Sequence, residues 1–237
     1  MWKPVTNLYL IRHGEAVSNV EPMVAGMRGD AGLTAKGISQ AERLRDRLAA
    51  TGEISADVFI ASTLPRARQT AEIIAPAIGL PIDWDDEVQE IRAGEADGLT
   101  LAELEARYGR PDFTSDPFRP FAPGGESWAG FVLRAEVALR RIAREHEDKT
   151  VVVVCHGGIV DASFGAFMAL SPLALTVSGF LTRNTSITHW SRRQFGGRPH
   201  RWRLECYNDA MHLSEHFHAG RSEPDTSHPA VPLASEE

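Results

Sequence analysis

Two histidines that directly follow apolar, strand-like runs are the residues best placed to do chemistry. Arg12 and His13 come behind the run Leu8–Ile11, and His156 comes behind the valine-rich run 151–155. The carboxyl ends of parallel strands meet at one edge of a sheet, where open α/β folds bind ligands. A histidine can act as a nucleophile through one ring nitrogen when a hydrogen bond holds the other.

Further cationic and carboxyl groups follow other predicted elements, and together they suit a phosphoryl group. Arg12 and Arg66 can each present a two-pronged guanidinium to the three equatorial oxygens of a phosphoryl group in transfer. His156 and the backbone N–H of Gly157, at the start of a predicted helix, would add donors. Glu90 could protonate a departing alkoxide and later take a proton from water. Because the arginines supply the charge, this chemistry requires no metal and no cofactor.

Helical and strand-like patterns alternate along the chain, which predicts an α/β fold with a largely parallel sheet. We expect strands near 8–12, 57–62, 82–84, 151–155, 187–190 and 202–207, and helices that begin near Thr34, Pro65, Ser127 and Gly157.

Length and composition favour one large domain. The chain has 237 residues, 43% of them hydrophobic and 24% charged, which is an ordinary globular composition. We expect this domain to span residues 1–213. The segment 110–125 combines four prolines with three phenylalanines and has no period, so we predict a lid over about 99–126. Residues 214–237 have the composition of a disordered tail.

Charge and cysteine usage exclude several classes of partner. The formal net charge is −7 and there is no basic block, so nucleic acid is not an expected partner. No apolar stretch is long enough to predict a membrane span, and the first residues lead quickly into a strand, which leaves no room for a signal peptide. Cys155 and Cys206 form no CxxC motif and are expected to be buried free thiols in the cytoplasm.

An ordered series of motifs resembles the histidine phosphatase superfamily, whose fold is that of the cofactor-dependent phosphoglycerate mutases. The motifs are Arg12-His13-Gly14-Glu15 with Asn19, Leu33-Thr34 with Gly37, the segment 62–71, Glu90 with Gly94 and Gly98, Gly124-Gly125-Glu126-Ser127, Cys155-His156-Gly157 and the segment 202–209. The resemblance covers about residues 6–213. It implies a three-layer α/β/α sandwich with a mostly parallel central sheet.

The resemblance also implies roles for individual residues. His13 would form the phosphohistidine, and Glu90 would be the proton donor. The phosphoryl group would be held by Arg12, Arg66 and His156, with Gly157 and Asn19 as further contacts.

Three more residues are candidate substrate contacts. Gly26 lies where related mutases place a substrate-contacting glycine, and Arg28 and Arg92 could meet a second anionic group of the substrate. Two positions depart from the family pattern: Ala16 replaces a common Ser or Thr, and Asp97 replaces a frequent Glu.

Several functions agree with these motifs to different degrees. The first is a metal-independent phosphomonoesterase acting on a small phosphorylated metabolite. The alternative is a phosphoglycerate-type mutase, although the arginine-bearing segment that known cofactor-dependent mutases carry after the acid motif is missing. A catalytically silent binding or regulatory module is a remote alternative, since no catalytic residue has been lost. The resemblance allows monomers as well as a homodimer or tetramer.

One motif points to different chemistry. Residues 212–216 have the HxxEH spacing of inverted zinc peptidases. That chemistry requires both histidines on one stable helix and a third ligand beyond them. Because the motif runs into the predicted tail, we expect no metal site there.

Overall fold

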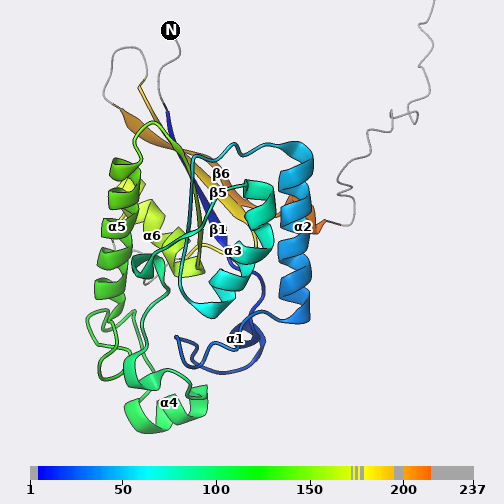
Figure 1. Ribbon diagram of the computed structural model, residues 1–237. Helices are drawn as coiled ribbons and strands as arrows, with labels where there is room; N and C mark the ends of the chain where they lie inside the picture. Colours follow the sequence, from blue (N-terminus) through cyan, green and yellow to red (C-terminus); the bar gives the residue numbers. More distant parts are fainter. Residues whose placement is uncertain (1–4, 172, 174–175, 177–178, 195–199, 215–237) are drawn as a thin grey trace, which may run out of the picture.

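The computed structural model describes residues 5–171, 173, 176, 179–194 and 200–214 (Figure 1). Six strands form one sheet in the order β3-β2-β4-β1-β5-β6. The strands are β1 (Thr6–Arg12), β2 (Val58–Ala61), β3 (Asp83–Trp84), β4 (Thr150–Cys155), β5 (Ile187–Arg193) and β6 (Arg201–Asp209). The first four run parallel, as predicted, whereas β5 is antiparallel to β1 and β6 is antiparallel to β5.

The register of the central pair brings the two histidine motifs together. Strands β1 and β4 are parallel neighbours, with Arg12 opposite Cys155. The next residue of each strand is a histidine, so His13 and His156 leave the sheet side by side. The strand order therefore confirms that the two motifs share one edge of the sheet.

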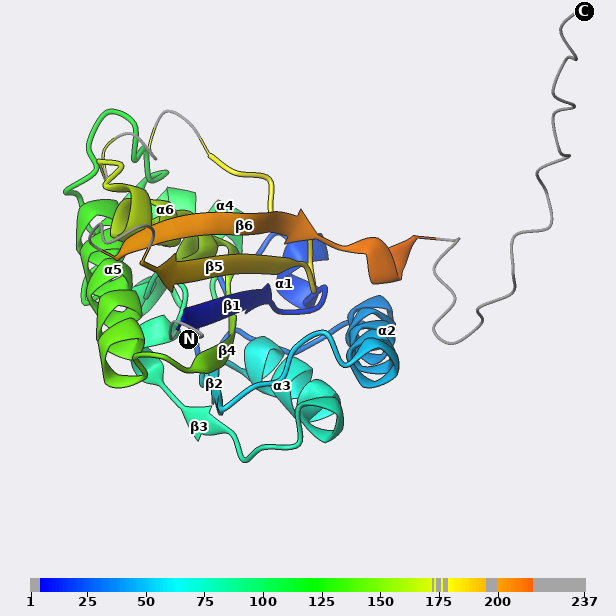
Figure 2. The ribbon, with the colours of Figure 1, turned by 90° about the horizontal axis from the view of Figure 1, so that it is seen from above.

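Helices cover both faces of the sheet, which confirms the predicted three-layer architecture. Figures 1 and 2 show α2 (Ala35–Thr51) and α3 (Pro65–Ile78) on one face and α5 (Trp128–Glu145) and α6 (Gly157–Met168) on the other. Side chains alternate across a strand, so β4 contributes Val152 and Val154 to one core and its other valines to the opposite core. A strand buried on both faces is expected to be apolar throughout.

The helices begin at the residues expected from the sequence. Thr34 caps α2, its side chain accepting a hydrogen bond from the N–H of Gly37, and Gly52 ends α2 in the left-handed conformation. Pro65 is the first residue of α3, where its fixed φ and missing N–H cost least. Ser127 caps α5 in the same way as Thr34 caps α2.

The predicted lid segment contains a helix that the pattern did not predict, α4 (Leu101–Tyr108). Thr100 and Glu103 form a capping box at its start. A small apolar cluster holds the segment against the loop after β1 through Val24, Leu104 and Ala122. The segment lies beyond the carboxyl end of the sheet in Figure 1; that it acts as a lid stays a prediction.

A short helix after β1, α1 (Val17–Val20), completes the α-helices of the described residues. None of these helices is long and apolar enough to cross a membrane. Cys155 and Cys206 are both free thiols, but only Cys155 is fully buried, while Cys206 is half-buried on β6. Apart from Ser214, the predicted tail lies outside the described residues.

Candidate active site

His13 is held with one ring nitrogen fixed and the other directed at an arginine. The ring is 3% exposed. Its Nδ1 lies 2.6 Å from the carbonyl oxygen of Gly14, which can only accept, so Nδ1 carries the proton. Nε2 therefore keeps its lone pair and accepts a hydrogen bond from Nε of Arg66 at 3.2 Å. A neutral imidazole that carries its lone pair on Nε2 is the form needed for attack on an electrophile.

The surroundings of His13 keep its ring neutral. Burial is the largest influence lowering its pKa well below the ordinary value, and the positive charges of Arg66 and Arg12 lower it further. The bond to Gly14 acts in the opposite direction and is outweighed. The His13 imidazole is thus unprotonated at neutral pH.

Arg66 is fixed by a buried ion pair. It lies in the first turn of α3, directly after Pro65. Its Nη1 donates to Asp30 Oδ2 at 2.7 Å and to the carbonyl of Ala25 at 3.1 Å, and the backbone N–H of Arg66 also donates to Asp30. The Asp30 side chain is 1% exposed. The guanidinium is therefore oriented before any substrate binds.

Arg12 reaches the same region from the end of β1. Its Nη1 donates to the carbonyl of Thr182, while its buried Nε has no acceptor among the described residues. The α6 N-terminus lies beside it, since a Cβ on Gly157 would come within 3.7 Å of Arg12 Nε. A buried guanidinium N–H without a protein acceptor, next to a helix N-terminus, suits an anionic ligand.

His156 completes the cluster of positive and hydrogen-bonding groups. Its ring centroid lies 5.2 Å from that of His13. Its Nε2 lies 2.8 Å from Ser62 Oγ, and its buried Nδ1 has no partner among the described residues. Burial is the main cause that lowers its pKa well below the ordinary value, followed by the charge of Arg66.

The Glu90 side chain is held by the N-terminal turn of α6. Its Oε2 accepts a hydrogen bond from the N–H of Gly158 at 3.0 Å, and its Oε1 accepts one from the N–H of Ile91 at 3.1 Å. The absence of a side chain at position 158 leaves room for this carboxylate. Glu90 is thus placed beside the same helix N-terminus as the two histidines.

Asn19 and a residue that the sequence did not single out, Asn184, hold the backbone of the histidine motif. Asn184 Nδ2 donates to the carbonyl of His13 at 3.0 Å and to Asn19 Oδ1 at 3.3 Å. The same oxygen of Asn19 accepts from the N–H of Ala16 at 3.0 Å. A phosphate contact by Asn19 stays a prediction, since its side-chain oxygen serves the protein backbone here.

The three candidate substrate contacts surround or border a cavity next to Glu90. This cavity has a volume of about 230 Å³, and Gly26 and Arg92 line it together with Glu90 and Asp97. Arg28 does not line the cavity, but its guanidinium pairs with Asp97, which does. Substrate contacts by these residues stay predictions.

Asp161 is a third carboxyl group near the site and was missed by the sequence reasoning. It lies on α6, and its buried Oδ1 has no partner among the described residues. Burial and, next, the negative charge of Glu90 raise its pKa to about 7, while Arg12 acts in the opposite direction. Asp161 follows no strand and belongs to no motif that the sequence reasoning used.

The described residues contain no group of three or more His, Cys, Asp and Glu side chains able to hold a metal ion. His212, the first residue of the HxxEH pattern, is buried, and its Nε2 lies 2.9 Å from Thr185 Oγ1. The second histidine of the pattern lies outside the described residues.

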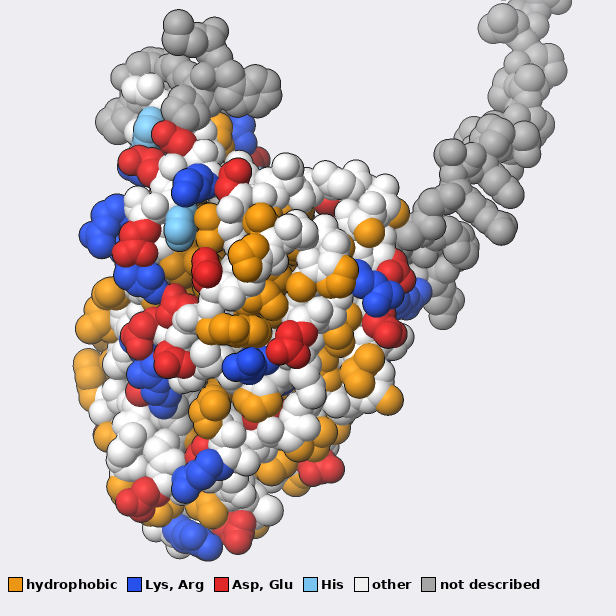
Figure 3. Space-filling view, in the orientation of Figure 1, with side chains coloured by type: hydrophobic (Ala, Val, Ile, Leu, Met, Phe, Trp, Pro, Cys, Tyr) orange, Lys and Arg blue, Asp and Glu red, His pale blue; other side chains and the backbone are white. Residues whose placement is uncertain are grey.

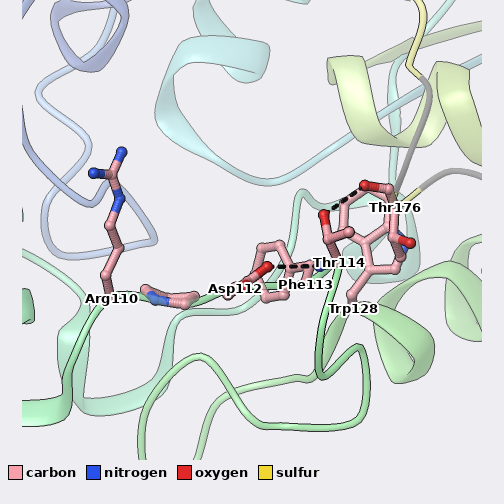
Figure 4. A pocket seen from close by; sticks show the side chains of 7 residues that line it. Arg110, Asp112, Phe113, Thr114, Trp128 and Thr176 are labelled. Carbon is pink, nitrogen blue, oxygen red and sulfur yellow. Dashed lines mark hydrogen bonds between the residues drawn. The ribbon is translucent and has the colours of Figure 1, made fainter.

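A larger hollow of about 460 Å³ lies on the proline-rich segment (Figure 4). Phe113 and Trp128 line it, and Thr114 donates a hydrogen bond to the carbonyl of Thr176 at its edge. In Figure 4, Arg110 points away from these residues. None of the proposed catalytic groups borders this hollow, so the smaller cavity beside Glu90 is the candidate site for the substrate's alcohol.

Residues 8–209 match the sequence model of the histidine phosphatase superfamily, branch 1. The chain belongs to this superfamily. A probable phosphoglycerate mutase, GpmB, of Erwinia tasmaniensis is 30% identical over 221 residues, which cover 88% of this chain and 95% of that protein.

Solved structures of the superfamily fold are also similar. YhfR of Bacillus stearothermophilus is 32% identical with a TM-score of 0.70, and the match covers 88% of this chain and all of that one. A mycobacterial glucosyl-3-phosphoglycerate phosphatase, solved with VO3, is 27% identical with a TM-score of 0.68, covering 85% of this chain and 98% of that one. A phosphoserine phosphatase of Entamoeba histolytica, solved with 3-phosphoglyceric acid, is 27% identical with a TM-score of 0.69, covering 88% and 100%. Histidine phosphatase relatives of this chain thus include both phosphatases and probable mutases.

Proposed function

We propose that the protein is a metal-independent phosphomonoesterase that hydrolyses a small phosphorylated metabolite through a phosphohistidine at His13. The observation that carries the proposal is the hydrogen bond from His13 Nδ1 to the carbonyl of Gly14, which leaves the Nε2 lone pair beside Arg66. The two solved phosphatase relatives support it, since each acts, by its name, on a phosphomonoester.

The first step transfers the phosphoryl group to the protein. His13 Nε2 attacks phosphorus in line, a P–N bond forms, and the P–O bond to the alcohol breaks. The electron pair leaves with the alcohol oxygen, which takes the proton of Glu90. Arg12, Arg66 and His156 stabilise the charge on the equatorial oxygens throughout.

The second step returns the protein to its initial state. The Glu90 carboxylate removes a proton from a water molecule, whose oxygen attacks phosphorus as the P–N bond breaks. Inorganic phosphate leaves, and His13 regains the lone pair on Nε2.

The test is phosphate release from a panel of phosphorylated metabolites and 4-nitrophenyl phosphate with EDTA present, comparing the wild type with His13→Ala. We expect turnover by the wild type and a loss of at least about 10⁴-fold in the variant, the scale seen when a nucleophile is removed. Circular dichroism checks that the variant is folded. Rapid quenching should trap an acid-labile phosphoprotein in the wild type alone.

Two results would overturn the proposal. Turnover that survives in His13→Ala would exclude this nucleophile. Phosphate transfer that requires a bisphosphate cofactor and 3-phosphoglycerate, without net release of phosphate, would instead assign the protein to the mutases.

A further inference from the structure

The cavity beside Glu90 is where the alcohol portion of a substrate has to lie. An acid must come within hydrogen-bond distance of the oxygen that it protonates. If Glu90 serves the leaving oxygen, the rest of the alcohol extends from that point into the 230 Å³ cavity that Glu90 lines. The composition of its wall therefore selects the substrate.

Much of this wall is apolar or backbone. Met27, Leu64 and Ile91 supply apolar side chains, and glycines supply backbone surface. Figure 3 shows that acidic and basic side chains are interspersed over the face drawn there, with apolar side chains between them, rather than gathered into one positive area.

The one arginine of the wall is already engaged by the protein. Arg92 Nη2 lies 3.0 Å from Glu87 Oε1 and donates to the carbonyl of Asp86 at 2.9 Å, while its Nε donates to Gln89 at 3.2 Å. An anionic group of a substrate would have to compete with the Glu87 carboxylate for this guanidinium.

A half-buried acid, Asp97, also lines the wall. Asp97 Oδ1 accepts hydrogen bonds from the N–H groups of Gly26 and Gly29 at 2.8 and 2.9 Å, and its Oδ2 accepts one from the N–H of Arg28 at 2.9 Å. These bonds fix the carboxylate in the wall. The guanidinium of Arg28 lies 3.8 Å from it on the solvent side, so this pair also adds no net positive charge.

Resting on the proposed function, we propose that the natural substrate is a phosphomonoester of a small alcohol without an acidic group. A carboxylate on the alcohol would leave water for a wall in which Arg92 is paired with Glu87 and Arg28 with Asp97, so neither guanidinium would be free to pair with it. Burying a carboxylate without a partner is strongly disfavoured. A neutral alcohol meets Met27, Leu64 and Ile91 without this cost. The sequence suggested that Arg28 and Arg92 bind a second anionic group of the substrate. In this proposal their guanidinium groups instead pair with Asp97 and Glu87.

Matched substrates test this proposal directly. Glycerol 3-phosphate and 3-phosphoglycerate differ in a hydroxymethyl group against a carboxylate, and phosphoethanolamine and phosphoserine differ by a carboxylate alone. We expect kcat/KM to be at least about tenfold higher for the member without the carboxylate in each pair, equivalent to about 1.4 kcal/mol. Equal or better turnover of the carboxylate member would overturn the proposal and leave the phosphatase activity established.

A variant outside the catalytic groups tests the cause. Glu87→Gln removes the carboxylate that holds Arg92 and should raise kcat/KM for 3-phosphoglycerate several-fold while glycerol 3-phosphate and 4-nitrophenyl phosphate change little. Glu145→Gln is the control, because Glu145 pairs with Arg141 in a similar surface contact on α5. If the ratio of kcat/KM for glycerol 3-phosphate to that for 3-phosphoglycerate is unchanged in Glu87→Gln, the pairing of Arg92 with Glu87 is not the cause of the preference. Failure of the wild type on every substrate, including 4-nitrophenyl phosphate, would instead reject the proposed function.

Discussion

The Nε–H group of Arg66 donates a hydrogen bond to Nε2 of His13 across 3.2 Å. This contact connects His13 to a cation that is itself held by Asp30. A cation at this distance disfavours protonation of the ring, and the same cation would bind the oxygens of a phosphoryl group carried on Nε2. Arg66 thus adds to the effect of burial in keeping the His13 ring neutral, and under the proposed function it would also stabilise a phosphoryl group on Nε2.

We predict that His13 stays neutral in the free protein well below pH 6.5. Burial is the main cause of its lowered pKa, and Arg66 and Arg12 add to it. The ring nitrogen resonances of His13 should show the Nδ1–H form at pH 6 in a ¹⁵N NMR titration, with the unfolded protein as reference. The lowered pKa means that the unfolded state binds more protons at acidic pH. The contribution of His13 to stability is therefore fully present above pH 6.5 and is lost as pH decreases below it. Titration near pH 6.5 would contradict this electrostatic account.

Asp30→Asn should lower the stability of the protein. The variant leaves the buried Arg66 without its carboxylate, and removing one partner of a buried ion pair costs about 3–5 kcal/mol. We expect Tm to fall by about 6 °C or more, since 1 kcal/mol shifts Tm by about 2–4 °C in a domain of this size. Inorganic phosphate should restore part of the loss by binding the folded state.

The control for this ion pair is Asp46→Asn. Asp46 pairs with Arg45 on the exposed surface of α2, and exposed pairs contribute about 0–1 kcal/mol. An equal decrease of Tm in the two variants would show that the buried ion pair of Asp30 contributes no more to stability than the exposed pair of Asp46.

Glu90→Gln should slow alkyl esters more than aryl esters. An alkoxide needs a proton as it leaves, whereas a nitrophenolate is stable without one, and general acid catalysis contributes about 10²–10⁴-fold. We expect kcat for glycerol 3-phosphate to fall within this range and kcat for 4-nitrophenyl phosphate to fall by less than about tenfold. Steady-state assays of both esters measure the ratio, and equal slowing would argue against Glu90 as the acid.

Two adjacent glycines offer a matched test of how Glu90 is placed. A Cβ at position 158 would lie 2.3 Å from Glu90 Oε1 and 2.7 Å from Phe131 Cζ, whereas a Cβ at position 157 would meet nothing closer than 3.7 Å. Gly158→Ala should therefore displace Glu90 and slow alkyl esters as Glu90→Gln does. Gly157→Ala keeps its backbone N–H and should lose much less activity. Similar kinetics for the two variants would contradict the packing described here.

The sequence predicted that residues at the carboxyl ends of parallel strands meet at one edge of the sheet. Arg12 ends β1 and His156 follows β4, and parallel pairing of these neighbouring strands is sufficient to place them at one edge. Pro65 and Thr34 mark helix starts through local backbone chemistry, which tertiary contacts do not need to specify. The direction of β5 and β6 is different: period and composition identify strands but do not specify with which neighbour, or in which direction, they pair.

The supporting residues could not be predicted because their roles depend on distant contacts. Asp30 meets Arg66 across 36 positions, and Asn184 meets His13 across 171. No spacing rule links such pairs. The start of helix α4 is predictable from the capping box of Thr100 and Glu103. The prolines that follow favour an irregular segment instead. Asp97, which departs from the family pattern, has a structural role, because its carboxylate accepts a hydrogen bond from the N–H of Gly26.

Asp161→Asn should stabilise the protein at alkaline pH and much less at acidic pH. Burial and the charge of Glu90 raise the pKa of Asp161 to about 7, so the folded protein disfavours the ionised form that the unfolded chain adopts above its ordinary pKa of 3.8. The wild type therefore loses stability as pH rises from about 4 through 7, and the amide does not. Thermal unfolding at pH 5 and pH 8 should show a Tm gain at pH 8 of about 2–4 °C, corresponding to about 1 kcal/mol after solvent screening. Histidine titration is common to both proteins and cancels in the difference.

Asp83→Asn, at an exposed position on β3, is the control and should show no pH-dependent gain in Tm. A gain in Tm that is equal at both pH values in Asp161→Asn would refute the raised pKa of Asp161.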